Sequence, residues 1–105
     1  MGIFDFFKGP DMQKGLDRFA GEPLAVLLDV RTPGEYAEGR IPGSRNLPLD
    51  RLNGEALPRE PDTPLFVYCY SGARSAQAAA RLRQLGYTDV TDLGGITRYK
   101  GKLEH

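Results

Sequence analysis

The sequence has 105 residues, with 13 glycines, 8 prolines, and 14 acidic side chains balanced by 14 basic ones. A chain of this length forms one domain that can bury a core without disulfides or metals. Zero net charge argues against binding nucleic acid or an anionic membrane surface through a basic field. The single cysteine excludes an intramolecular disulfide and any multi-thiolate zinc or iron–sulfur centre.

The only histidine is His105, in a terminal Leu-Glu-His stretch (103–105) that reads as the scar of an expression tag. Without His105 the sequence has no histidine to act as the general base. Ser-His-Asp and Cys-His mechanisms are therefore not expected. No stretch approaches the roughly 18 apolar residues of a membrane span, and residues 1–7 lack the basic start of a signal peptide. Because a free thiol also fits a reducing compartment, we expect a cytoplasmic protein.

The N-terminal part, residues 1–21, is predicted to be a segment packed on the main domain, which we place at 22–102. The apolar residues between 3 and 7 are expected to tuck onto that domain. Residues 11–19 have the apolar spacing of a short amphipathic helix, which Gly21 ends.

The next stretch, residues 24–30, is nearly all apolar and has the pattern of a strand covered on both faces. Thr32 follows as the expected cap of a short helix, with Pro33 at its first position and Glu35 in its first turn. That helix is predicted to end at Gly39.

Strands and helices continue to alternate along the rest of the chain. The predicted elements are an extended piece at 44–47, a helical start at 49–52, a buried strand at 65–69, an Ala-rich helix at 73–85, a strand at 89–93, a turn at 94–95 and a helical turn at 96–100. Ala78, Leu82 and Leu85 mark the face of the Ala-rich helix that is expected to pack on the sheet. This alternation predicts an α/β fold of three layers, with an open, mostly parallel sheet flanked by helices. Ligands of such sheets bind outside the carboxyl ends of the strands.

Cys69 falls at such an end and is followed by a short loop that leads into the Ala-rich helix. The small residues Ser71, Gly72 and Ala73 let successive backbone N–H groups converge on an anion at the helix N-terminus. A cysteine at that point has its thiolate, the nucleophilic form, favoured. Arg74 adds a fixed positive charge and a fork of donors for an oxyanion.

The alternative interpretation is that Cys69 is only a small hydrophobic residue of the core. This is the commonest role of a lone cysteine in an apolar strand. The loop that follows, with its glycine and arginine, favours the functional reading. Tyr68 and Tyr70 flank the cysteine and point to the opposite face of the strand, so one is expected in the core and the other in the wall of a pocket.

These residues occur in an order that resembles a known family. The loop Cys69-Tyr-Ser-Gly-Ala-Arg74-Ser75 resembles the active-site loop of rhodanese-like sulfurtransferase domains, Cys-x-x-Gly-x-Arg-Ser/Thr. The block from Asp29-Val-Arg31 through Glu35-Tyr36 to Gly39-Arg-Ile-Pro-Gly-Ser44 and Asn46 resembles a second motif of that family. Leu93-Gly94-Gly95 resembles a third, the glycine pair after its late strand. The similarity spans about residues 24–100.

The resemblance implies a parallel α/β sheet and a sulfurtransferase in which Cys69 accepts a sulfane sulfur as a persulfide. The implied partners are a small sulfane-sulfur donor, such as thiosulfate or a persulfide, and a thiol or cyanide-like acceptor, with an acceptor protein as a further candidate. No cofactor or metal is expected. The active-site loop is assigned to Tyr70, Ser71, Gly72, Ala73, Arg74 and Ser75.

Two positions depart from the family pattern. Arg40 stands where the family often has histidine, and Tyr99 lies near a position where tryptophan is common. Both are expected to border the pocket and to influence the choice of donor, without carrying the chemistry.

Each of three residues near the loop has two possible roles, one functional and one structural. Asp29 and Arg31 either orient the loop and receive substrate charge, or fix the turn, with Arg31 paired to Glu35 or Glu38 and Asp29 bound to backbone N–H groups. Ser75 either caps the helix or donates toward a bound anion. The structural reading is favoured for each of the three.

Two other functions remain open. A persulfide carrier or sulfur and redox sensor with little turnover fits a loop that has a single arginine. An arsenate reductase or phosphatase fits less well, because those related enzymes have one more residue between the cysteine and the arginine, and the shorter loop encloses a tetrahedral oxyanion poorly.

Overall fold

The computed structural model describes residues 11–53 and 56–105. The predicted placement of the apolar residues between 3 and 7 therefore lies outside the described residues. The described residues form one sheet of four parallel strands in the order β2-β1-β3-β4. Their bounds are β1 (Val26–Asp29), β2 (Ser44–Asn46), β3 (Leu65–Cys69) and β4 (Val90–Gly95).

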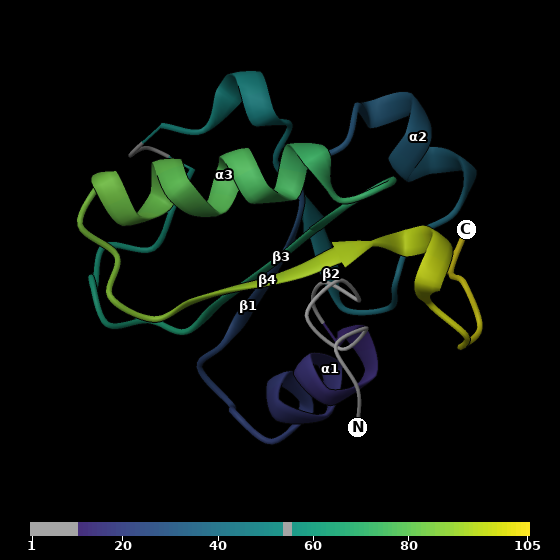
Figure 1. Ribbon diagram of the computed structural model, residues 1–105, viewed down its shortest axis with the longest axis horizontal. Helices are drawn as coiled ribbons and strands as arrows, with labels where there is room; N and C mark the ends of the chain where they lie inside the picture. The colour runs from purple at the N-terminus through teal and green to yellow at the C-terminus, as the bar shows by residue number, and fades with distance from the viewer. Residues whose placement is uncertain (1–10, 54–55) are drawn as a thin grey trace, which may run out of the picture.

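Three α-helices and two short 3-10 helices complete the described fold, and the main helices cover both faces of the sheet (Figure 1). The α-helices are α1 (Met12–Ala20), α2 (Pro33–Glu38) and α3 (Ala73–Gln84), and the 3-10 helices are η2 (Leu49–Arg51) and η3 (Ile96–Arg98). The predicted three-layer α/β architecture with a parallel sheet is confirmed.

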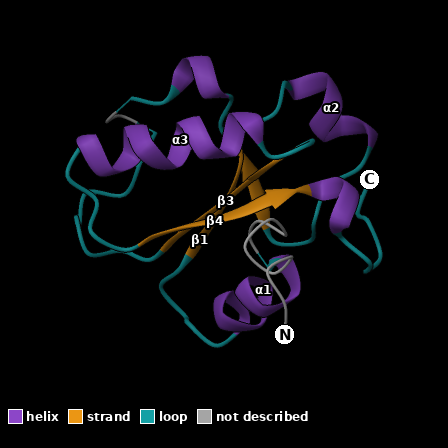
Figure 2. Cartoon of the chain, in the orientation of Figure 1, coloured by secondary structure: helices purple, strands orange, loops and turns teal. Residues whose placement is uncertain are grey.

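The core has two halves, one on each face of the sheet. The half beneath α3 is built on alternate residues of β3 together with α3 itself, including Leu65, Val67, Cys69, Ala78 and Leu82. The other half lies under α1, which Figure 2 shows on the opposite side of the sheet from α3. Its members include Met12, Leu27, Phe66, Tyr68 and Leu93. All five residues of β3 are buried, because this strand lies inside the sheet and is covered on both faces.

Two details differ from the prediction. Gly94 and Gly95 belong to β4 and pair with Tyr68 and Cys69, after a register shift at Val67 and Tyr68, whereas the sequence predicted a turn there. Leu85, expected on the buried face of the Ala-rich helix, is 47% exposed, because α3 ends at Gln84 and the chain turns away at Gly86.

Candidate active site

Cys69 is the last residue of β3, and its side chain packs on the same face of the sheet as α3. The residue is 1% exposed. The backbone N–H of Gly72 donates to the Cys69 Sγ at 2.9 Å. The sulfur therefore lies against the inside of the loop, next to the N-terminus of α3, where a peptide donor and the helix dipole both favour negative charge.

The shape of the loop depends on Gly72, which precedes the first residue of α3. Its φ of +113° lies in the left-handed region, where residues with a side chain are strained. In this conformation the Gly72 carbonyl accepts the first helical bond from Ala76, and its N–H turns back to the sulfur. No side chain caps α3 at this position.

The loop rests directly on β4. A Cβ added to Gly95 would lie 2.5 Å from the Tyr70 carbonyl oxygen and 2.8 Å from the Ser71 α-carbon, so only glycine fits. Ser75, which is completely buried, donates to the Gly72 carbonyl at 3.1 Å and the Gly94 carbonyl at 3.4 Å. Its hydroxyl thus joins the loop to β4.

Arg74 forms a bidentate ion pair with Glu35 of α2. Nη1 donates to Oε1 at 2.7 Å and Nη2 to Oε2 at 3.0 Å. Glu35 also accepts from the Thr32 backbone N–H, while Thr32 accepts from the Glu35 N–H, which completes the capping box of α2. The hydrogen bond from Arg74 lowers the pKa of Glu35 to about 2 against the opposing effect of burial, so this carboxylate is charged at neutral pH.

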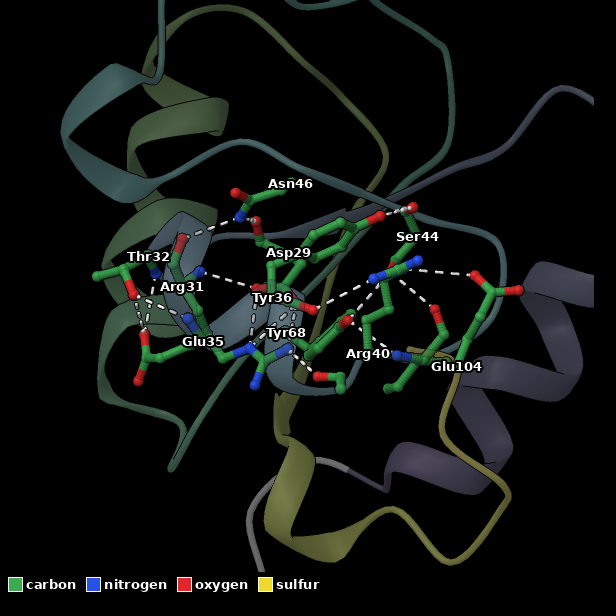
Figure 3. Close-up of polar contacts among 12 residues, drawn as sticks. Asp29, Arg31, Thr32, Glu35, Tyr36, Arg40, Ser44, Asn46, Tyr68 and Glu104 are labelled. Carbon is green, nitrogen blue, oxygen red and sulfur yellow. Dashed lines mark hydrogen bonds and ion pairs between the residues drawn. The ribbon is translucent and has the colours of Figure 1, made fainter.

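Asp29 and Arg31 form a second pair, at the carboxyl end of β1 (Figure 3). Arg31 donates to both carboxylate oxygens, with the shortest contact 2.7 Å from Nη2 to Oδ2, and its backbone N–H donates to Oδ1. The Arg31 side chain is 5% exposed and that of Asp29 is fully buried. The predicted bond of Asp29 to a backbone N–H is confirmed, whereas the alternative pairing of Arg31 with Glu35 or Glu38 is wrong.

Neighbouring groups hold this pair in place. The Asn46 side-chain amide donates to the carbonyls of Asp29 and Arg31, and Arg31 donates to the Gly39 carbonyl (Figure 3). The sequence indicates Asn46 as the end of the second family motif, without a contact for its side chain. Its role needs the parallel pairing of β1 with β2, which the local sequence does not specify.

The two positions that depart from the family pattern lie away from the loop. Arg40 packs over the Tyr36 ring and faces the Glu104 carboxylate at 3.4 Å (Figure 3). The Tyr99 ring packs in the half of the core under α1, and its hydroxyl donates to the Lys102 carbonyl. Neither side chain lines the clefts beside the loop.

Among the described residues, two open clefts include residues of the loop. The first cleft has a volume of about 320 Å³ and is lined by Arg31, Glu35, Glu38, Gly39, Tyr70, Ile96, Thr97 and Leu103. The Tyr70 residue in this lining is 52% exposed. The other, of about 290 Å³, includes Arg74 and is lined by Val30, Arg31, Thr32, Pro48, Leu49, Asp50 and Arg74. Tyr70 therefore forms part of a pocket wall, and Tyr68 lies in the core, as the strand alternation predicted.

The described residues contain neither a metal-binding cluster nor a membrane-spanning helix. No group of three or more His, Cys, Asp and Glu side chains in residues 11–53 and 56–105 is arranged to hold a metal ion. Within the same ranges, no helix combines the length and apolar character needed to cross a bilayer.

Comparison with known proteins places this loop in a family. The model of the rhodanese-like domain matches residues 12–102, and the chain belongs to that family. It is an enzyme of the sulfurtransferase class. A sulfurtransferase of Allochromatium vinosum is 40% identical over 87 residues, which cover 82% of this chain and 81% of the relative.

Two further relatives agree. The thiosulfate sulfurtransferase GlpE of Stutzerimonas stutzeri is 40% identical over 91 residues, covering 87% of this chain and 81% of its own length. Among solved structures, the human single-domain sulfurtransferase TSTD1 superposes with a TM-score of 0.66 at 32% identity, covering 78% of this chain and 85% of the human one.

Proposed function

We propose that the protein transfers sulfane sulfur from a small donor to a thiophilic acceptor through a persulfide on Cys69. The observation that carries the proposal is the 2.9 Å hydrogen bond from the Gly72 N–H to Sγ at the N-terminus of α3. This donor and the helix dipole stabilise a thiolate without a histidine base. Relatives named as thiosulfate sulfurtransferases support thiosulfate as a donor.

The proposed reaction has two halves. The Cys69 thiolate attacks the outer sulfur of the donor, the S–S bond of the donor breaks, and its electron pair leaves with the remainder, which is sulfite when thiosulfate is the donor. The persulfide then gives its outer sulfur to cyanide or a thiol, and the thiolate returns. Cys69 is the only cysteine, so no second thiol of the same chain can resolve the persulfide.

The burial of Cys69 favours a compact acceptor, or an acceptor protein whose thiol approaches the loop. The same burial is compatible with the alternative function, a persulfide carrier with slow turnover. Cys69 is 1% exposed, and this restricts the access of bulky donors to its sulfur. Turnover separates the two functions. A carrier forms the persulfide once and releases it slowly to small acceptors, whereas an enzyme produces many equivalents of thiocyanate from donor and cyanide.

The test is a steady-state assay with thiosulfate, a thiosulfonate and an organic persulfide as donors and cyanide as acceptor. We expect multiple turnovers with at least one donor and none with Cys69→Ser. Thermal unfolding of the variant checks that the fold is retained, as an exchange of sulfur for oxygen at one buried position should allow. Turnover that persists in the Cys69→Ser variant would contradict the proposal.

A further inference from the structure

Two exposed apolar side chains from distant parts of the chain meet beside the active-site loop. Tyr70, which is 52% exposed, follows Cys69 directly, and Leu103, which is 37% exposed, lines the same cleft as Tyr70. Ile96 adds a third apolar side chain to that lining. We call Tyr70, Ile96 and Leu103 the apolar rim. Exposed apolar side chains that gather in one place mark a site for another molecule, whereas isolated ones do not.

Backbone contacts hold the apolar rim in place. The Tyr70 carbonyl accepts from the Thr97 N–H at 3.4 Å, which ties the loop to η3. Arg40 and Glu104 exchange two backbone hydrogen bonds, of 2.9 and 2.8 Å, and these fix Leu103 beside the cleft (Figure 3). Although the sequence predicts a tag scar at these last residues, we take Leu103 as part of the surface because of this pairing. A bound molecule therefore meets a preformed surface, which lowers the entropic cost of binding.

A carboxylate borders the apolar rim. Glu35 and Glu38 line the same cleft, and Glu35 is held by Arg74. Glu38 is exposed, and it forms no ion pair with any other residue that the structure describes. A basic group on a bound molecule can therefore pair with Glu38 without displacing an existing partner.

The burial of Cys69 limits which molecules use this surface. A small acceptor such as cyanide is too short to reach the loop and cover the rim at the same time. A cysteine in an extended peptide can do both, because each residue of such a chain spans about 3.3–3.6 Å. Its neighbours along the peptide then lie as far from the reacting sulfur as Tyr70 lies from Cys69 along the strand.

We propose that the apolar rim and Glu38 form a docking surface for the sulfur acceptor, a protein whose reactive cysteine lies in an exposed segment between an apolar and a basic residue. This proposal rests on the proposed function, because it concerns the second half of that reaction. The thiolate of the acceptor attacks the outer sulfur of the Cys69 persulfide. The bond between the two persulfide sulfurs breaks, its electron pair returns to the Cys69 Sγ, and the acceptor leaves as the new persulfide. The surface concerns the acceptor alone, and thiosulfate can serve as the donor throughout.

The test compares short cysteine peptides as acceptors. With thiosulfate as donor, kcat/KM is measured for three end-blocked tripeptides, Leu-Cys-Lys, Gly-Cys-Lys and Leu-Cys-Glu, from the peptide persulfide trapped by alkylation. We expect the wild type to prefer Leu-Cys-Lys over Gly-Cys-Lys about tenfold, as partial burial of one leucine side chain allows. The preference over Leu-Cys-Glu should be about threefold, because the charge contact is exposed.

Two variants separate the apolar contact from the charged one. Tyr70→Ala should reduce the leucine preference to about twofold, and Glu38→Gln should remove the lysine preference. Since each variant is compared on the same peptides, differences in intrinsic thiol reactivity cancel. Leu85→Ala is the matched control, because Leu85 is 47% exposed but follows α3, whose 12 residues place it roughly 18 Å from the loop. It should leave both preferences unchanged.

The wild type alone can overturn the proposal, by transferring sulfur to the three peptides equally well. So can a leucine preference that survives Tyr70→Ala in a folded variant that still turns over cyanide. Salt provides a further measurement without a variant. The lysine preference of the wild type should fall as the salt concentration rises to about 1 M, and a constant preference would remove the role of Glu38.

The two proposals fail differently. If the wild type forms no persulfide and produces no thiocyanate from cyanide, the proposed function falls. Turnover with cyanide combined with no preference among the peptides removes only the docking surface.

Discussion

Gly95 of β4 lies against the backbone of Ser71, with room for no side chain between the strand and the active-site loop. A methyl group at this position would overlap the loop backbone, which cannot rotate away as a flexible side chain can. We expect Gly95→Ala to displace the loop, to destabilise the fold by about 1–3 kcal/mol and to lower sulfur transfer by roughly 10–100-fold, since small misplacements are costly to catalysis. Chemical denaturation and the steady-state assay measure the two effects.

Gly86→Ala is the control for this prediction. Gly86 has a φ of +107°, but nothing lies within 4 Å of the position its Cβ would take. The substitution therefore carries only the cost of a left-handed residue, about 1–2 kcal/mol, and should leave kcat unchanged. If both glycine variants lost the same amount of activity, contact between β4 and the loop would not be what positions Cys69.

Asp29→Asn tests the buried pair beside the loop. The substitution leaves the Arg31 guanidinium buried without its carboxylate, and breaking such a pair costs about 3–5 kcal/mol. We expect a loss of this size in the free energy of unfolding, measured with urea. Glu104→Gln removes the partner of Arg40, where the carboxylate is 54% exposed, and should cost less than about 1 kcal/mol. Similar losses in the two variants would contradict the structural role assigned to Asp29.

The Arg74–Glu35 pair predicts a dependence of stability on pH. The hydrogen bond from Arg74 lowers the pKa of Glu35 from its ordinary value of 4.5 to about 2, so the folded state favours the carboxylate. Its stabilisation is fully present above pH 4.5 and is lost as the pH falls toward 2. The difference in unfolding free energy between the wild type and Glu35→Gln should therefore shrink across this range. A difference that stays constant from neutral pH to pH 2 would contradict the ion pair.

Local sequence signals were sufficient for the elements that carry the loop. The strand at 65–69 and the start of α3 at Ala73 follow the prediction, because an apolar run and an Ala-rich stretch each have a strong intrinsic pattern. The Thr32 cap and the position of Pro33 also follow it. This local pattern was enough to predict that Cys69 lies at the end of a buried strand.

The sequence alone does not predict which residues distant along the chain contact the site residues. Arg31 has Asp29, Glu35 and Glu38 within a few residues, and spacing alone does not choose among these carboxylates. The choice depends on α3, which places Arg74 beside Glu35 and leaves Asp29 for Arg31. The two glycines at the end of β4 have the composition of a turn, and the close approach of the loop that requires Gly95 is visible only in three dimensions.

The most direct test of the central claim is the intact mass of the protein after incubation with a sulfane donor and removal of the excess, followed by peptide mapping. We expect a mass increase of one sulfur atom, located on Cys69, which is lost on addition of cyanide with release of thiocyanate and is absent in the Cys69→Ser variant. An unchanged mass with every donor class, thiosulfate, thiosulfonate and organic persulfide, would contradict it.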